Sequence, residues 1–154
     1  MSVRQSVTIA LVVVALLLCA TRPTEASPSS DAMATVKAMV DNFNKGDTAA
    51  TVATCAPQTA IIDDFPPHTW QSCSAWDAAL SAFNTAHGMT DGIETLGTPW
   101  HVDVAGNVAY VVVPTTYAYK VRGKPVTESG SVWTLVLRKT AAGWRITSWA
   151  WAAH

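Results

Sequence analysis

Hydrophobic residues in the first third of the chain recur every three or four positions. Met33, Val36, Met39, Val40 and Phe43 follow this spacing with polar residues between them, which predicts an amphipathic helix with one buried stripe.

Two more helices are expected before residue 90. Gly46 ends the first helix and Asp47 caps the second, over 48–56, which Pro57 cannot continue. A third helix begins at Ser72 or Ser74, where Ser74 and Asp77 have the spacing of a capping box. It buries one face, ends before Gly88, and places His87 one turn beyond Phe83; that buried face consists of Trp76, Leu80 and Phe83.

From Ile93 onward the spacing of hydrophobic residues changes from helical to alternating. Strands are predicted over 93–104, 108–121, 126–139 and 144–151, separated by turns. In the first of these strands, one face is expected to carry Leu96, Trp100, Val102 and Val104. The order of helices followed by an antiparallel meander predicts an α+β fold in which three helices cover one side of a curved sheet.

One early strand interrupts the helices, in the stretch 61–70 with the sequence IIDDFPPHTW. Successive side chains of a strand point to opposite faces, so Asp63 and Asp64 cannot both face a pocket. Pro66 and Pro67 end the strand or place it at a sheet edge, and we expect His68 and Trp70 on a loop leading away.

Residues 1–26 have the features of a secretory signal peptide. Arg4 precedes the apolar run 7–20, which is shorter than the ~20 residues of a spanning helix, and Ala26 offers a cleavage point. An uncleaved anchor is the alternative. Residues 27–31 are expected to form a flexible lead-in to one domain over 32–154, and the protein to be secreted or periplasmic.

Charge narrows the choice of partners. Removal of 1–26 takes Arg4, Arg22 and Glu25 from 10 basic and 11 acidic side chains, leaving 8 and 10. With no excess of positive charge, the chain is not expected to bind nucleic acid or an anionic membrane surface. Seven tryptophans among few charges indicate a well-filled or ligand-holding interior.

Cys55 and Cys73 remain after cleavage. In an oxidising compartment they could form a disulfide, and the alternative is two buried thiols.

The run 36–65, VKAMVDNFNKGDTAATVATCAPQTAIIDDF, resembles the opening of nuclear transport factor 2-like domains, which include the SnoaL-like cyclases and ketosteroid isomerase. The N-x-G-D link between two helices, the strand ending in an acid and the closing Trp-rich strand carry the resemblance. It implies a cone-shaped curved sheet closed by helices around an apolar cavity, and often a homodimer.

Ketosteroid isomerase uses an Asp base and an oxyanion hole made from a Tyr and a protonated Asp. By resemblance the base falls on Asp63, the Tyr on Met39, and the second acid near Val132, between Ser131 and Trp133. Because Met39 and Val132 cannot hold an enolate, we argue against steroid isomerisation.

Three functions stay open. The favoured one is binding of a small hydrophobic molecule with Asp63 as polar anchor. The second is catalysis by a cyclase, dehydratase or hydrolase, with Asp63 as general base and His68, His87 or His101 as partner acid. The third is an interaction module without ligand. Besides Asp63, the candidate ligand contacts are Met39, Phe43, Trp76, Phe83, Tyr117, Trp133 and Trp149.

Each candidate also has an ordinary structural explanation. Asp63 could cap a turn, His68 could be a surface residue, and His87 could simply favour a helix end. No two histidines have metal-ligand spacing on one face, and no glycine-rich phosphate loop is present, so we expect neither metal nor cofactor.

Overall fold

The computed structural model describes residues 27–153, and the predicted signal peptide over 1–26 lies outside them. The helices are α1 Pro28–Asn44, α2 Thr48–Ala53 and α3 Cys73–His87. The strands are β1 Cys55–Ile62, β2 Thr69–Trp70, β3 Met89–Leu96, β4 His101–Ala105, β5 Val108–Val121, β6 Lys124–Thr140 and β7 Gly143–Ala152. None of the described helices is both long and apolar enough to cross a membrane.

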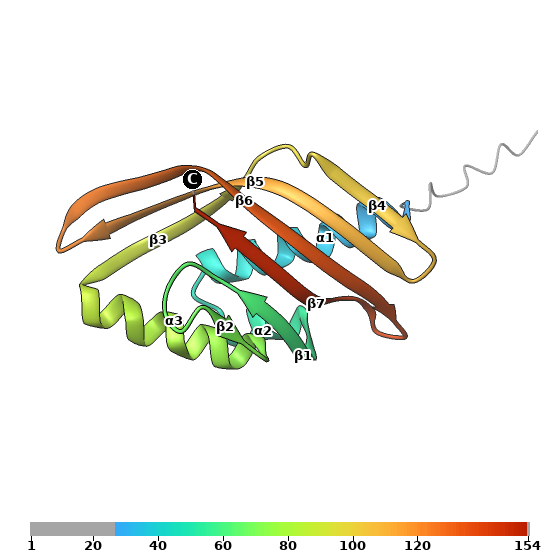
Figure 1. Cartoon of the computed structure of the whole chain (residues 1–154), viewed down its shortest axis with the longest axis horizontal. Helices are drawn as coiled ribbons and strands as arrows, with labels where there is room; N and C mark the ends of the chain where they lie inside the picture. Colours follow the sequence, from blue (N-terminus) through green and yellow to red (C-terminus); the bar gives the residue numbers. More distant parts are fainter. Residues whose placement is uncertain (1–26, 154) are drawn as a thin grey trace, which may run out of the picture.

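The strands form one seven-stranded sheet in the order β2-β1-β7-β6-β5-β3, and β4 also pairs with β5. Strands β5 and β6 are long and curved, and all three helices lie on the same side of the sheet (Figure 1). The α+β prediction is therefore confirmed. The sheet is mixed rather than fully antiparallel, because β1 runs parallel to β7.

Helix α1 begins earlier than expected, so the flexible lead-in predicted for 27–31 is wrong. The hydroxyl of Ser27 accepts a hydrogen bond from the amide of Ser30, and Pro28 occupies the first turn. Both residue types favour a helix start. The buried stripe of α1 consists of Ala32, Val36, Met39 and Val40.

Helix α2 ends at Ala53, short of the predicted Ala56, because β1 already begins at Cys55. Pro57 lies inside β1, where the pairing with β7 shifts register between Cys55 and Ala60. Such an irregularity accommodates a proline that has no amide to donate. Cys55 forms a disulfide with Cys73, which joins the start of β1 to the start of α3.

Helix α3 starts with Ser72, whose hydroxyl accepts a hydrogen bond from the amide of Ala75. This selects Ser72 over Ser74 as the N-cap. The helix ends at Gly88 in the left-handed conformation, as the sequence predicts.

Trp70 does not lie on an exposed loop, which corrects the sequence prediction. The chain reverses after β1, so that Trp70 in β2 pairs with Ile61, and its ring lies 4.5 Å from that of Phe65. Trp70 is buried by these contacts.

The strand predicted over 93–104 is two strands. Both β3 and β4 pair with β5, and the segment 97–100 between them contains Gly97 and Pro99. Trp100 precedes β4 and is 61% exposed, so it does not share the interior face of Val102 and Val104.

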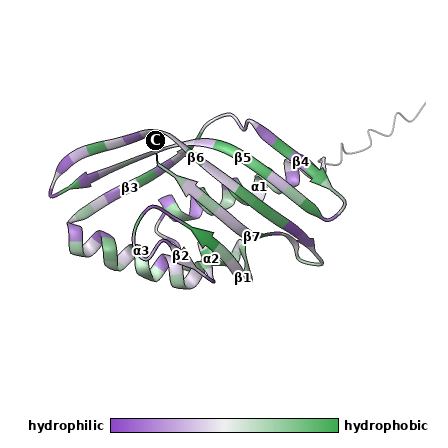
Figure 2. Ribbon diagram, in the orientation of Figure 1, coloured by the Kyte–Doolittle hydropathy of each residue, from purple (hydrophilic) through white to green (hydrophobic). Residues whose placement is uncertain are grey.

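The core lies between α1 and the inner face of the sheet. Fully buried side chains alternate along β5 and β6, and they include Val111, Val113, Leu135 and Leu137. Each such side chain contributes roughly 1.5–3 kcal/mol by its burial. Hydrophilic bands gather where β5 and β6 approach their shared turn, beyond this core (Figure 2).

Candidate functional site

A cavity of about 570 Å³ lies between the inner face of the sheet and helices α1 and α3. Its wall is mostly aromatic and aliphatic. The buried apolar side chains that line it are Met39, Val40, Phe65, Trp76, Trp133 and Trp149. The exposed residues at its rim are Asp64, Pro66, Ala86, His87 and Arg122.

Asp63 lies in this wall, directly after β1. The alternation of the strand buries Ile61 and Asp63 and exposes Ile62 and Asp64. One carboxylate oxygen of Asp63, Oδ2, accepts a 2.7 Å hydrogen bond from Nε1 of Trp76, and the other, Oδ1, accepts a 2.8 Å bond from the amide of Asp64. Only 9% of Asp63 is exposed.

Burial in this wall raises the pKa of Asp63 from 3.8 to about 7. The hydrogen bonds from Trp76 and from the Asp64 amide oppose the shift, but desolvation of the charged form outweighs them. The carboxyl group can therefore exchange a proton near neutral pH.

A second group of polar residues crosses the sheet in one row, and only Tyr117 of this group was predicted from the sequence. Glu94 on β3 pairs with Tyr117 on β5, and Tyr117 pairs with Glu128 on β6. Residues opposite each other in antiparallel strands share a face and have Cβ atoms about 4.5–5.5 Å apart. All three residues line the cavity.

A bulge at Gly130 turns Glu128 inward. On β6 the inward residues have odd numbers from Ser131 to Leu137, but the pairing with β5 skips Gly130, and Glu128 then faces inward. Gly130 has a φ of 83°, which suits glycine at a bulge. A similar register shift in β3 lies between Thr90 and Ile93.

The position of Glu94 is fixed from α1. The side chain of Asn44 donates to the carbonyl of Glu94 and accepts from its amide, both at 2.8 Å. Close by, Gly92 leaves room for the phenol ring of Tyr117, because a Cβ at position 92 would overlap that ring.

Burial raises the pKa of two residues of this row, Glu94 and Tyr117. Burial raises the pKa of Glu94 from 4.5 to about 7, and the negative charges of Glu128 and Asp63 add to the effect. Burial also raises the pKa of Tyr117 to about 12, with Glu94 and Glu128 contributing. Glu128 accepts a 2.6 Å hydrogen bond from the hydroxyl of Tyr119.

Several buried polar atoms along the cavity have no hydrogen-bond partner. They are Oδ1 of Asn84, Oε1 of Glu94 and Nε1 of Trp133. Buried polar atoms are nearly always paired, so these three are available to a bound molecule.

All seven large side chains predicted as ligand contacts line the cavity together with Asp63: Met39, Phe43, Trp76, Phe83, Tyr117, Trp133 and Trp149. Their rings contact one another, and Trp76 and Trp133 both make edge-to-face contacts with Trp149.

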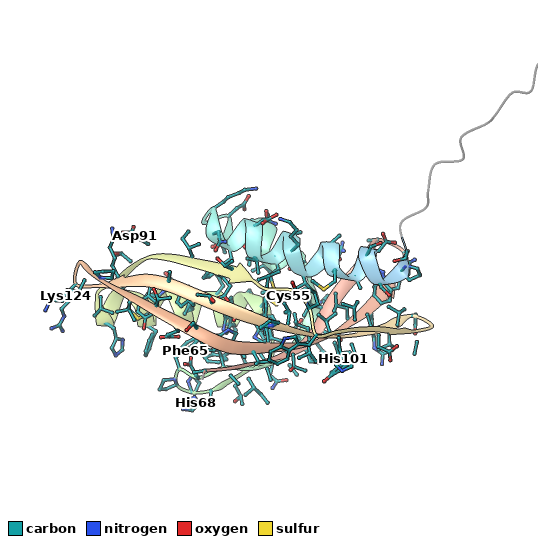
Figure 3. All side chains as sticks on the ribbon, turned by 90° about the horizontal axis from the view of Figure 1, so that it is seen from above. Cys55, Phe65, His68, Asp91, His101 and Lys124 are labelled. Carbon is teal, nitrogen blue, oxygen red and sulfur yellow. A yellow bond between two sulfur atoms is a disulfide. The ribbon has the colours of Figure 1, made fainter. Side chains whose placement is uncertain are left out.

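The candidate histidines are not brought to the Asp63 carboxylate. His68 is exposed on the loop after β1, where its Nδ1 lies 3.1 Å from the carbonyl oxygen of Asp63, and His101 is exposed on β4 (Figure 3). Neither lines the cavity. His87 reaches the rim, with its Nδ1 2.8 Å from the carbonyl oxygen of Phe83.

Metal binding finds no support within 27–153, where no group of three or more His, Cys, Asp or Glu side chains is arranged to hold an ion.

Comparison with known proteins identifies the family. The model of the SnoaL-like domain matches residues 32–151. The chain belongs to the SnoaL-like family. No curated protein matches the sequence significantly.

Solved structures agree on the fold of this SnoaL-like domain. A nuclear transport factor 2-like protein from Salmonella enterica is 16% identical, with a TM-score of 0.70 over 82% of this chain and 90% of its own. A ketosteroid isomerase-like protein from Erwinia carotovora is 19% identical, with a TM-score of 0.66 over 82% and 96%. The CaMKII hub of S. rosetta is 18% identical, with a TM-score of 0.65 over 84% and 98%. At these identities the likeness shows the fold alone.

Proposed function

We propose that this SnoaL-like domain binds a small hydrophobic molecule in its cavity, with Asp63 as the polar anchor. The observation that carries the proposal is a cavity of about 570 Å³ whose apolar wall contains a buried carboxyl group. Ligand pockets commonly combine such a volume with aromatic walls and a few convergent polar groups.

The alternative hypothesis, an interaction module without ligand, explains the cavity less well. In such a module we expect the space behind the sheet to be filled with side chains. Here the unpartnered Nε1 of Trp133 and Oε1 of Glu94 would remain unsatisfied unless a molecule contacts them.

Catalysis is the second candidate, and a specific observation favours it. Asp63 and Glu94 both have a pKa of about 7 in one cavity, so one could accept a proton while the other donates one. The reaction class would be that of a cyclase, dehydratase or hydrolase acting on a small hydrophobic substrate. Glu94 replaces histidine as the partner of Asp63 in this mechanism.

We also propose that the protein works outside the cytoplasm, secreted or in the periplasm. The Cys55–Cys73 disulfide supports this location, because disulfides persist in oxidising compartments. Homodimer formation stays a prediction that sedimentation analysis can check.

Binding can be tested with N-phenyl-1-naphthylamine, a neutral apolar dye that fluoresces when it leaves water. We expect saturable binding of one dye per chain. Ala86→Trp, which places an indole at the cavity rim, should weaken it at least about tenfold. The matched control is Ala82→Trp, on an exposed position of the same helix that does not line the cavity. Equal dye affinity in both variants, or no binding to the wild type, would contradict the proposal.

A further inference from the structure

The cavity holds more acid than base. Asp63, Glu94 and Glu128 all line it, and none of them has an ion-pair partner within the described residues. The salt bridges of the described residues lie outside the cavity, between Lys37 and Asp41 on α1 and between Lys120 and Asp91.

The basic side chains that line the cavity lie at its rim. Arg122 and His87 are exposed there, whereas the acids come from three separate elements of the interior. The ionisable groups that line the cavity are Asp63 and Asp64 after β1, His87 of α3, Glu94 of β3, Tyr117 and Tyr119 of β5, Arg122 of the following turn, and Glu128 of β6.

Aromatic rings surround these carboxyl groups. Phe43, Trp76 and Tyr117 are neighbours, with ring centroids of Phe43 6.2 Å from Trp76 and 6.3 Å from Tyr117. The faces of such rings attract cations, and most strongly where water is excluded. Acidic and aromatic side chains in one cavity are therefore complementary to a positively charged apolar molecule.

Trp133 adds an independent requirement. It is only 6% exposed and lines the cavity, and its Nε1 donates to no partner. An indole N–H in this situation needs an acceptor, which the carboxyl groups of the protein do not supply. The bound molecule must carry that acceptor itself.

We propose that the ligand is a hydrophobic cation, namely a protonated amine or quaternary ammonium on an apolar body that also carries a hydrogen-bond acceptor. The ammonium lies near Glu94 and Glu128, and the acceptor faces Nε1 of Trp133. This inference rests on the proposed binding function and specifies its ligand class.

A cation in the cavity changes the protonation of its walls. Because it favours the charged form of Asp63 and Glu94, it lowers their pKa from about 7, and binding near pH 7 releases protons. Neutral molecules of the same shape release none.

The test compares three probes with one apolar body, the 5-ammonium, 5-hydroxy and 5-carboxylate derivatives of 2-adamantanone, in which the shared ketone oxygen supplies the acceptor for Nε1 of Trp133. Calorimetric titration at pH 8.5 should show the cation binding at least about tenfold more tightly than the alcohol, and the carboxylate most weakly. At pH 5.0, below the pKa of about 7 of Asp63 and Glu94, the preference for the cation over the alcohol should be smaller than at pH 8.5. At pH 7 the measured heat should depend on the buffer in the direction of proton release for the cation, and not in that direction for the alcohol or the carboxylate.

Variants identify the groups responsible. Glu94→Gln and Glu128→Gln should each reduce the ratio of cation affinity to alcohol affinity at pH 8.5, and together they should abolish the preference. Both changes leave His87 in place, so any loss of preference is due to the carboxyl groups and not to the imidazole. Asp103→Asn, at an exposed position of β4 outside the cavity, is the matched control and should keep the full preference.

The possible failures have different meanings. Equal or tighter binding of the alcohol at pH 8.5 would overturn the cation assignment and leave the apolar-binding function standing. A preference that survives in the double variant would also overturn it. Failure of all three probes and of N-phenyl-1-naphthylamine to bind would overturn the binding function itself.

Discussion

The indole N–H of Trp76 on α3 donates a 2.7 Å hydrogen bond to the carboxylate of Asp63 at the end of β1. This bond crosses from helix to sheet inside the cavity wall. It lowers the pKa of Asp63 against the larger, opposite effect of burial.

Trp76→Phe removes this donor while keeping an aromatic ring. We expect the pKa of Asp63 to rise above about 7, because the charged form loses a hydrogen bond. We also expect a loss of about 1–3 kcal/mol of unfolding free energy. Carbon-13 NMR titration of the carboxyl group and urea unfolding measure the two effects. Trp100→Phe, at a 61% exposed indole, should change neither.

Stability should fall as the pH rises. Asp63 and Glu94 have unfolded-state pKa values near 3.8 and 4.5 and folded-state values of about 7, so the folded protein binds more protons between these limits. Their stabilising contribution is therefore fully present below about pH 4 and is lost as the pH rises through 7.

Glu94→Gln should reduce this pH dependence and stabilise the protein at pH 8 by more than about 1 kcal/mol, because an amide carries no charge to desolvate. Urea unfolding at intervals from pH 4 to 8 measures the slope. The exposed Asp103→Asn should leave the slope unchanged. An equally steep slope in Glu94→Gln would show that Glu94 titrates normally.

The disulfide between Cys55 and Cys73 spans 18 residues and joins β1 to α3. Replacing both cysteines by serine should cost about 3 kcal/mol of unfolding free energy, because the unfolded chain regains its freedom. A reducing agent should lower the urea midpoint of the wild type and not that of the double variant. If reduction leaves the wild type unchanged, the bond contributes nothing to stability.

Asn44 connects the end of α1 to β3 through two hydrogen bonds with the backbone of Glu94. Asn44→Ala should lower the unfolding free energy by about 1–3 kcal/mol and accelerate hydrogen exchange at the Glu94 amide, which loses its partner. Asn107→Ala, at an exposed turn position, is the control. Unchanged protection of the Glu94 amide would contradict this positioning role.

The three helices and the long strands could be predicted because each of them follows a local rule. Helical spacing in 33–43, the Gly46-Asp47 link and the alternation in 108–121 all appear in the structure as expected. The position of Asp63 could also be predicted, because alternation places Asp63 and Asp64 on opposite faces and the family resemblance selects Asp63.

Glu94 could have been predicted, because alternation places it on the face of Leu96, two residues later. Glu128 was missed for a physical reason. Strict alternation along β6 from Ser131 and Trp133 assigns Glu128 to the outer face, and only the bulge at Gly130 reverses this. A glycine inside an alternating strand is the signal that could have indicated it. The pairing of Trp70 with Ile61 depends on how the Pro-rich loop folds back, which no local pattern specifies.

The central claim is that the cavity holds a small hydrophobic molecule anchored by Asp63. Native mass spectrometry of the wild type and of Asp63→Asn, each purified from the original host, tests it most directly. The account predicts that the wild type carries a bound mass that dissociates on denaturation, and that Asp63→Asn carries at most about a tenth as much. Equal occupancy in the two proteins would show that Asp63 does not anchor the ligand. A wild type without any bound mass would contradict the claim that the cavity holds a ligand.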